Sequence, residues 1–156
     1  TTNVTCASLD CLGGLLKHGS HTSALLSPLV LDVLDDGSEL TAVNPLRVKI
    51  FEVLGRTMGE GTRGGNTKVV CSALRATMIA VEAVGSINRA NSAGGDGKRE
   101  VLKSLDFHKT CLLINQLLGS DPFQPFPGSG SGGGGNVTFH ALGLLHSMSR
   151  CFGRQV

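Results

Sequence analysis

The sequence predicts an all-α protein, because apolar residues recur at helical spacing between glycine-rich and proline-rich breaks. No segment sustains the alternation of apolar and polar residues that indicates a strand. The 156 residues include no Trp and no Tyr, so the core is expected to be aliphatic. Hydrophobic residues make up 40% of the chain and charged residues 17%, which excludes a compositionally disordered protein.

The first three predicted helices each carry a start or stop signal. Residues 5–17 place leucines on one helical face. The pairs Ser27-Pro28 and Asn44-Pro45 each set a capping side chain before a proline at the first helical position. The helix that starts at Ser27 should end before residues 35–37, and the one that starts at Asn44 should end near Gly59.

Two longer helices are expected further along the chain, at residues 66–90 and at residues 98–118. The glycine-rich segment 59–65 is expected to be a flexible connector between helices. It lacks the Gly-Lys-Ser/Thr ending of a phosphate-binding loop and does not follow a predicted strand.

Residues 128–135 form a Gly/Ser tract that cannot bury surface and therefore predicts a flexible linker. The chain is accordingly divided into a helical domain at 1–127, this linker, and an amphipathic helix at 136–156. Natural tracts of this kind exist. An alternating Gly/Ser run is also typical of laboratory linkers that tether a peptide to its receptor, and we favour that interpretation.

The terminal segment predicts a helix at about residues 139–152, which would be marginally stable alone and needs a host. Eight flexible residues reach roughly 15 Å, far enough for this helix to dock on the helical domain. The expected docking residues are Phe139, Leu142, Leu144, Leu145, Met148 and Phe152.

The receiving groove is expected on two apolar stripes of the central helices, because these stripes are continuous in the sequence pattern. Its predicted lining residues are Ile50, Phe51, Leu54, Met58, Leu74, Met78 and Val81.

The sequence predicts no enzyme, because it lacks the Gly-x-Ser-x-Gly turn that carries a nucleophilic serine. Cys6 and Cys11, with His18 and His21 nearby, match no common zinc spacing. We therefore expect no catalytic residue, no metal and no cofactor, and no small-molecule ligand.

The five cysteines predict reduced thiols in an intracellular protein, either cytoplasmic or nuclear, because an odd number lies mostly within apolar helical patterns. No uninterrupted apolar stretch reaches the roughly 18–20 residues of a membrane span, and no signal-peptide pattern opens the chain. A membrane association is therefore not expected.

Residues 44–58, Asn-Pro-Leu-Arg-Val-Lys-Ile-Phe-Glu-Val-Leu-Gly-Arg-Thr-Met, resemble the second half of a HEAT or armadillo repeat. The resemblance covers residues 40–118, and no repeat period of about 40 residues aligns across the chain. It implies a stack of helical pairs with an elongated groove that binds peptides or other helices. A compact irregular bundle is the alternative architecture.

These observations favour a protein–protein interaction module, an adaptor or scaffold that binds the amphipathic helix of a protein partner. In this chain residues 136–156 would stand in for that partner. One alternative is a structural or oligomerisation domain whose own terminal helix completes the bundle. The other is a nucleic-acid-binding domain that uses the basic residues between Arg47 and Arg89, although the net charge of +2 is too small to imply nucleic acid.

Overall fold

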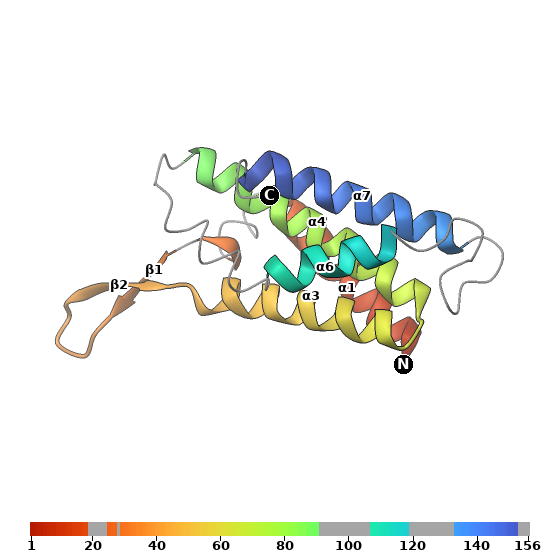
Figure 1. Ribbon diagram of the computed structural model, residues 1–156. Helices are drawn as coiled ribbons and strands as arrows, with labels where there is room; N and C mark the ends of the chain where they lie inside the picture. The colour runs from red at the N-terminus through yellow and green to blue at the C-terminus, as the bar shows by residue number, and fades with distance from the viewer. Residues whose placement is uncertain (19–24, 28, 91–106, 119–132, 153–156) are drawn as a thin grey trace.

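The computed structural model describes residues 1–18, 25–27, 29–90, 107–118 and 133–152. These residues form an all-α fold to which one two-stranded hairpin is attached, as Figure 1 shows. The described elements are α1 (Thr2–Lys17), β1 (Leu29–Val33), β2 (Glu39–Val43), α3 (Pro45–Arg63), α4 (Thr67–Ala90), α6 (Phe107–Leu118) and α7 (Gly133–Phe152).

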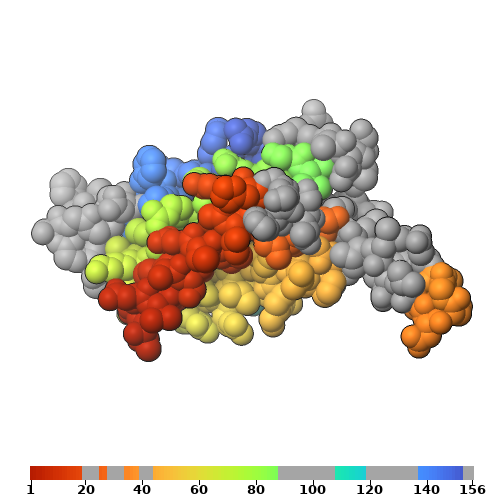
Figure 2. Space-filling view, turned by 180° about the vertical axis from the view of Figure 1, so that it is seen from behind, coloured from red at the N-terminus to blue at the C-terminus, as the bar shows by residue number. Residues whose placement is uncertain are grey.

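Helix α4 lies at the centre of the fold and packs against α1, α3 and α7, while α6 packs against α7. In the view from behind, α1 lies in front of α4 and α3, and α7 lies along the edge of the molecule opposite α3 (Figure 2). The core is aliphatic as predicted, with Leu54, Leu74, Val81 and Leu144 fully buried. The 21 residues Thr67–Ile87 are long and apolar enough to cross a membrane, and 56% of their most apolar window is buried inside the fold.

Helices α1, α4 and α7 run parallel and keep a common register. Asp10 of α1 pairs with Arg75 of α4, and Ser147 of α7 donates a hydrogen bond to Glu82 of α4; the partners are 65 residues apart in both cases. Four residues of α1 recur in α4 at the same spacing of 65. They are Thr2, Val4, Cys6 and Leu9, which correspond to Thr67, Val69, Cys71 and Leu74. This spacing differs from the roughly 40 residues of a HEAT or armadillo repeat. The predicted HEAT-like stack stays a prediction.

The predicted start of the third helix is confirmed, and its predicted end is wrong. The Asn44 side chain accepts a hydrogen bond from the Leu46 N–H (3.1 Å), and Pro45 occupies the first helical turn. The helix continues through Gly59 and ends at Arg63.

Residues 59–65 are therefore not a flexible connector, because most of them belong to α3. The reason is packing: a Cβ added at Gly61 would meet the Val70 side chain at 3.0 Å, so the bare backbone lets α3 and α4 approach closely. The turn to α4 follows at once and uses Gly65 in the left-handed region, with φ of 63°.

The helix predicted at Ser27–Leu34 is wrong, because β1 occupies this segment and pairs antiparallel with β2. The register joins Leu29 with Val43 and Val33 with Glu39. A short apolar run that contains β-branched valines suits a strand as well as a helix, and periodicity alone does not distinguish them. The Asp-Asp-Gly sequence that follows forms the hairpin turn, in which Gly37 adopts φ of 78°.

The predicted helix ends at residues 17, 90, 118 and 152 are confirmed, whereas the predicted starts shift by a few residues. The first helix starts at Thr2 and the fourth at Thr67. Helix α6 is described from Phe107, and residues 98–106 of its predicted span lie outside the described residues. Residues 128–132 of the predicted linker also lie outside them, whereas its last three residues form the first turn of α7.

Candidate functional site

The most extensive helix–helix interface of the described residues joins α4 to α7, and it presents a candidate binding site for a helix. One face of α7 is buried along its length, and its residues follow helical spacing. The buried residues are Val137, Ala141, Leu144, Met148, Cys151 and Phe152. Helix α6 forms a second wall of this site with Ile114 and Leu117, which are also buried.

Two glycines let α4 and α7 approach closely. A Cβ added at Gly85 of α4 would overlap the Sγ of Cys151 and lie 3.0 Å from its Cβ. A Cβ added at Gly143 of α7 would lie 3.1 Å from the Sδ of Met78. Each helix thus offers a side chain to a glycine of the other, which fixes how the two helices fit together.

Polar contacts border the apolar face of this interface. The Ser147 hydroxyl donates to the Glu82 carboxylate at 2.9 Å, and Arg150 lies 3.5 Å from the same oxygen. Both members of the Arg150–Glu82 pair are substantially exposed, so the ion pair orients the helices and adds little stability.

His140 lies closer to the N-terminus of α7, where burial and then the charge of Arg75 lower the pKa of its side chain. Its Nδ1 is buried without a hydrogen-bond partner among the described residues. The uncharged form of His140 is therefore the one that suits this interface.

The structure places the predicted groove residues in the core. Phe51, Leu54 and Met58 of α3 are buried in the core beneath α4, and the Thr77 hydroxyl of α4 donates to the Met58 sulfur at 3.6 Å. Leu74 and Val81 of α4 are fully buried as well, whereas Ile50 and Met78 are half-buried.

The main contacts of α7 are with α4 and α6 rather than with α3. The predicted α4 stripe therefore lies near the terminal helix, but the predicted α3 stripe is covered by α4. Sequence reasoning missed the α6 wall and the two glycines. The signal for the glycines was present, since Gly85 and Gly143 interrupt strongly apolar helical patterns.

The predicted docking residues of the terminal helix divide into two groups. Leu144, Met148 and Phe152 are buried against the domain, and Leu145 is half-buried. Phe139 and Leu142 are 71% and 50% exposed. They lie roughly 150° round the helix from Leu144, and the structure therefore turns them away from α4.

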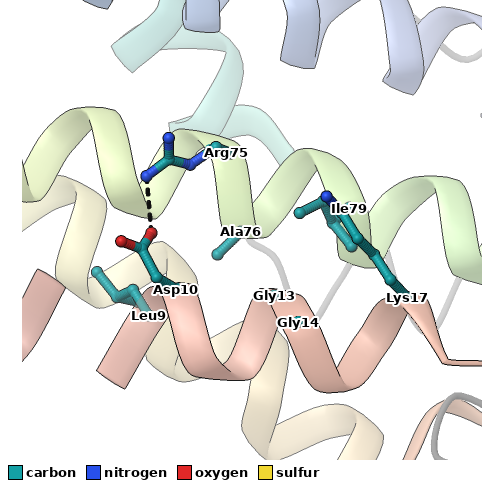
Figure 3. Close-up of a pocket in the computed structure, with 8 residues that line it drawn as sticks. All are labelled: Leu9, Asp10, Gly13, Gly14, Lys17, Arg75, Ala76 and Ile79. Atoms are coloured by element: carbon teal, nitrogen blue, oxygen red, sulfur yellow. Dashed lines mark hydrogen bonds and ion pairs between the residues drawn. The ribbon is translucent and has the colours of Figure 1, made fainter. Parts of the chain in front are cut away.

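A pocket of about 340 Å³ lies between α1 and α4, on another side of α4 from α7 (Figure 3). Asp10 and Arg75 form a 2.7 Å ion pair at one end, and Lys17 and Ile79 lie at the other. Gly13 and Gly14 of α1 line it between these ends. Among the described residues its lining holds no serine, cysteine or histidine, and the one carboxylate among them is paired with Arg75, so these residues offer no nucleophile with an adjacent base.

The candidate metal ligands of the sequence do not come together in the described part of the chain. Cys6 is half-buried and Cys11 is exposed on α1, and His21 lies outside the described residues. Across the described ranges, no three His, Cys, Asp or Glu side chains form a group that could hold a metal ion.

Three of the basic residues proposed for nucleic acid are buried or take part in ion pairs. Arg47 is 1% exposed and donates to the Leu26 carbonyl, and Arg75 and Lys49 are paired with Asp10 and Glu52.

Comparison of the chain with models of protein families, with curated proteins and with solved structures gives no match.

Proposed function

We propose that this chain is a protein–protein interaction module in which α4 and α6 hold an amphipathic helix, supplied here by α7. The observation that carries the proposal is the buried face of α7 together with its glycine fit on α4. Burial of four large side chains contributes about 6–10 kcal/mol before ordering costs, which is enough for a complex between tethered partners. In this proposal the protein acts as an adaptor or scaffold that binds the amphipathic helix of a protein partner.

The chain composition supports a helix that acts as a ligand. Residues 128–135 are glycine and serine, a composition that suits a tether. Helix α7 alone contains internal glycine and would be marginally stable in water, so its folding depends on the surface that receives it.

The test is to cut the full chain after it has folded. A protease site inserted between residues 128 and 132 separates α7 from the rest without removing it. We expect the two pieces to stay together on a sizing column, and a labelled peptide of residues 133–156 added in excess to replace the original α7.

A matched pair of peptide variants makes the test specific. Leu144→Asp places a charge on the buried face and should abolish replacement, whereas Leu142→Asp places it on the exposed face and should compete as well as the original peptide. Equal competition by both variants would contradict the proposed site.

The alternative is a structural domain whose own terminal helix completes the bundle. It is favoured by one observation, that Ala141 and Leu144 are fully buried and belong to the same apolar cluster as α4. Under this alternative the cut protein does not exchange α7, and loss of α7 leaves a molten remainder that no peptide restores.

A further inference from the structure

Two cysteines lie on neighbouring helices that pack together, Cys6 on α1 and Cys71 on α4. Cys6 and Cys71 are free thiols, and both are half-buried. Cys71 also packs against the apolar core.

The register of the two helices brings these thiols together. At one end, Asn66 donates a hydrogen bond to the Thr2 hydroxyl at 3.0 Å, and at the other Arg75 pairs with Asp10 at 2.7 Å. Thr2, Cys6 and Asp10 are each one helical turn apart and share a stripe of α1. Cys71 lies one turn before Arg75 on α4, so Cys6 and Cys71 occupy the level between the two anchoring contacts.

Two further observations agree with this placement. The backbones of α1 and α4 approach closely further along, where a Cβ added at Gly13 would lie 4.0 Å from the Cα of Ala76. Burial raises the pKa of Cys71; the charge of Arg75 lowers it and the neighbouring Cys6 raises it, which agrees with the register.

We propose that Cys6 and Cys71 form a modification site at which reaction with a small-molecule disulfide joins α1 covalently to α4. The inference is independent of the proposed function, since α1 and α7 pack on different sides of α4.

The chemistry is two successive thiol–disulfide exchanges. With oxidised glutathione, the Cys6 thiolate attacks one glutathione sulfur, forms a mixed disulfide and releases one glutathione thiolate. The Cys71 thiolate then attacks the Cys6 sulfur, which forms the Cys6–Cys71 bond and releases the second glutathione thiolate. The two cysteines lose two electrons and two protons, and one oxidised glutathione becomes two reduced glutathione molecules.

The test is to treat the folded full chain with oxidised glutathione, block remaining thiols with N-ethylmaleimide, and digest with trypsin. Cleavage after Lys17, Lys68 and Arg75 yields the peptides 1–17 and 69–75. We expect mass spectrometry to find them linked by a disulfide that reduction removes.

Peptide 1–17 also contains Cys11, which is exposed and provides the matched control. The link should survive in Cys11→Ser and disappear in both Cys6→Ser and Cys71→Ser. A link that persists in Cys6→Ser would overturn the proposal, and so would a wild-type protein that carries glutathione on Cys6 without any link to peptide 69–75.

A second measurement does not depend on variants. Because the bond closes a loop of 65 residues in the unfolded chain, the oxidised protein should melt roughly 5–15 °C above the same protein in dithiothreitol. The link without a rise in melting temperature would show a bond between positions that the native fold keeps apart, and would also overturn the proposal.

Discussion

At the scale of single residues, glycines have different roles that the sequence alone does not separate. Gly59 and Gly85 both lie inside helices, α3 and α4. A Cβ at Gly59 would meet nothing within 4 Å, whereas a Cβ at Gly85 would overlap Cys151 of α7. Gly59 therefore only weakens α3, whereas Gly85 allows α4 and α7 to pack closely.

The same substitution should then have opposite effects at the two positions. Gly59→Ala should raise the free energy of unfolding by about 0.5–1 kcal/mol through helix propensity. Gly85→Ala should lower it by about 1–3 kcal/mol, because the new methyl group displaces Cys151. Urea unfolding followed by circular dichroism measures both, and destabilisation of equal size in the two variants would show that α7 is not seated on Gly85.

A second residue-scale prediction concerns His140 and pH. Its pKa is lowered in the folded protein from the ordinary value of 6.5, first by burial and then by the charge of Arg75. Below pH 6.5 the unfolded chain therefore binds a proton that the folded chain resists. The contribution of His140 to stability is fully present above that pH and is lost as the pH falls toward the folded pKa.

The variant His140→Gln should therefore lose less stability than the wild type between about pH 7 and about pH 5. His146→Gln changes an exposed histidine of the same helix and serves as the matched comparison. Urea unfolding at several pH values gives both slopes, and identical slopes for the wild type and His140→Gln would rule out this contribution.

At the scale of elements, the start of α3 follows from a local signal, but its end does not. Asn44-Pro45 identifies the start of α3 because capping depends on a few adjacent residues. The end of α3 depends on Gly61 packing against Val70 of the next helix, which no local pattern reveals. The β1–β2 hairpin does not follow from the sequence pattern, because a five-residue apolar run fits either a strand or a helix and Asp-Asp-Gly suits a hairpin turn as well as a helix end.

The candidate site was predicted in part for the same reason. The buried half of α7, including Leu144 and Met148, follows from helical spacing within one segment. Its walls depend on which helices become neighbours, and that is a property of the whole fold. The sequence therefore indicated that α7 needs a host, but it did not identify α6 as part of that host.

Asn44 gives the element-scale prediction, because it joins two segments. Its side chain caps α3 and also donates to the carbonyls of Ser27 (2.9 Å) and Leu25 (3.4 Å), and it is 1% exposed. Asn44→Ala should lower the free energy of unfolding by about 2 kcal/mol, since it removes the cap and two hydrogen bonds to part-buried carbonyls. Asn44→Ser retains a capping oxygen and should lie between Asn44→Ala and the wild type. Equal losses in the two variants would show that the cap itself contributes nothing.

At the scale of the whole molecule, stability is centred on α4. Three helices bury their apolar faces against it, whereas the hairpin projects away from the helices (Figure 1). Local opening is easiest where few contacts oppose it.

Amide hydrogen exchange should therefore be slowest in the middle of α4, faster in α1 and α7, and fastest in β1 and β2. Mass spectrometry of peptides from the full chain measures this order. Protection of the hairpin equal to that of α4 would contradict it, because hydrogen bonds of an isolated hairpin are marginal in water.

The shared register of α1, α4 and α7 also limits where the length of the chain can change. Polar pairs between α4 and each of the other two helices join residues 65 positions apart. An insertion or deletion within any of the three helices would shift one member of these pairs relative to the other. A change in length that keeps both pairs must therefore fall in the segments between the helices.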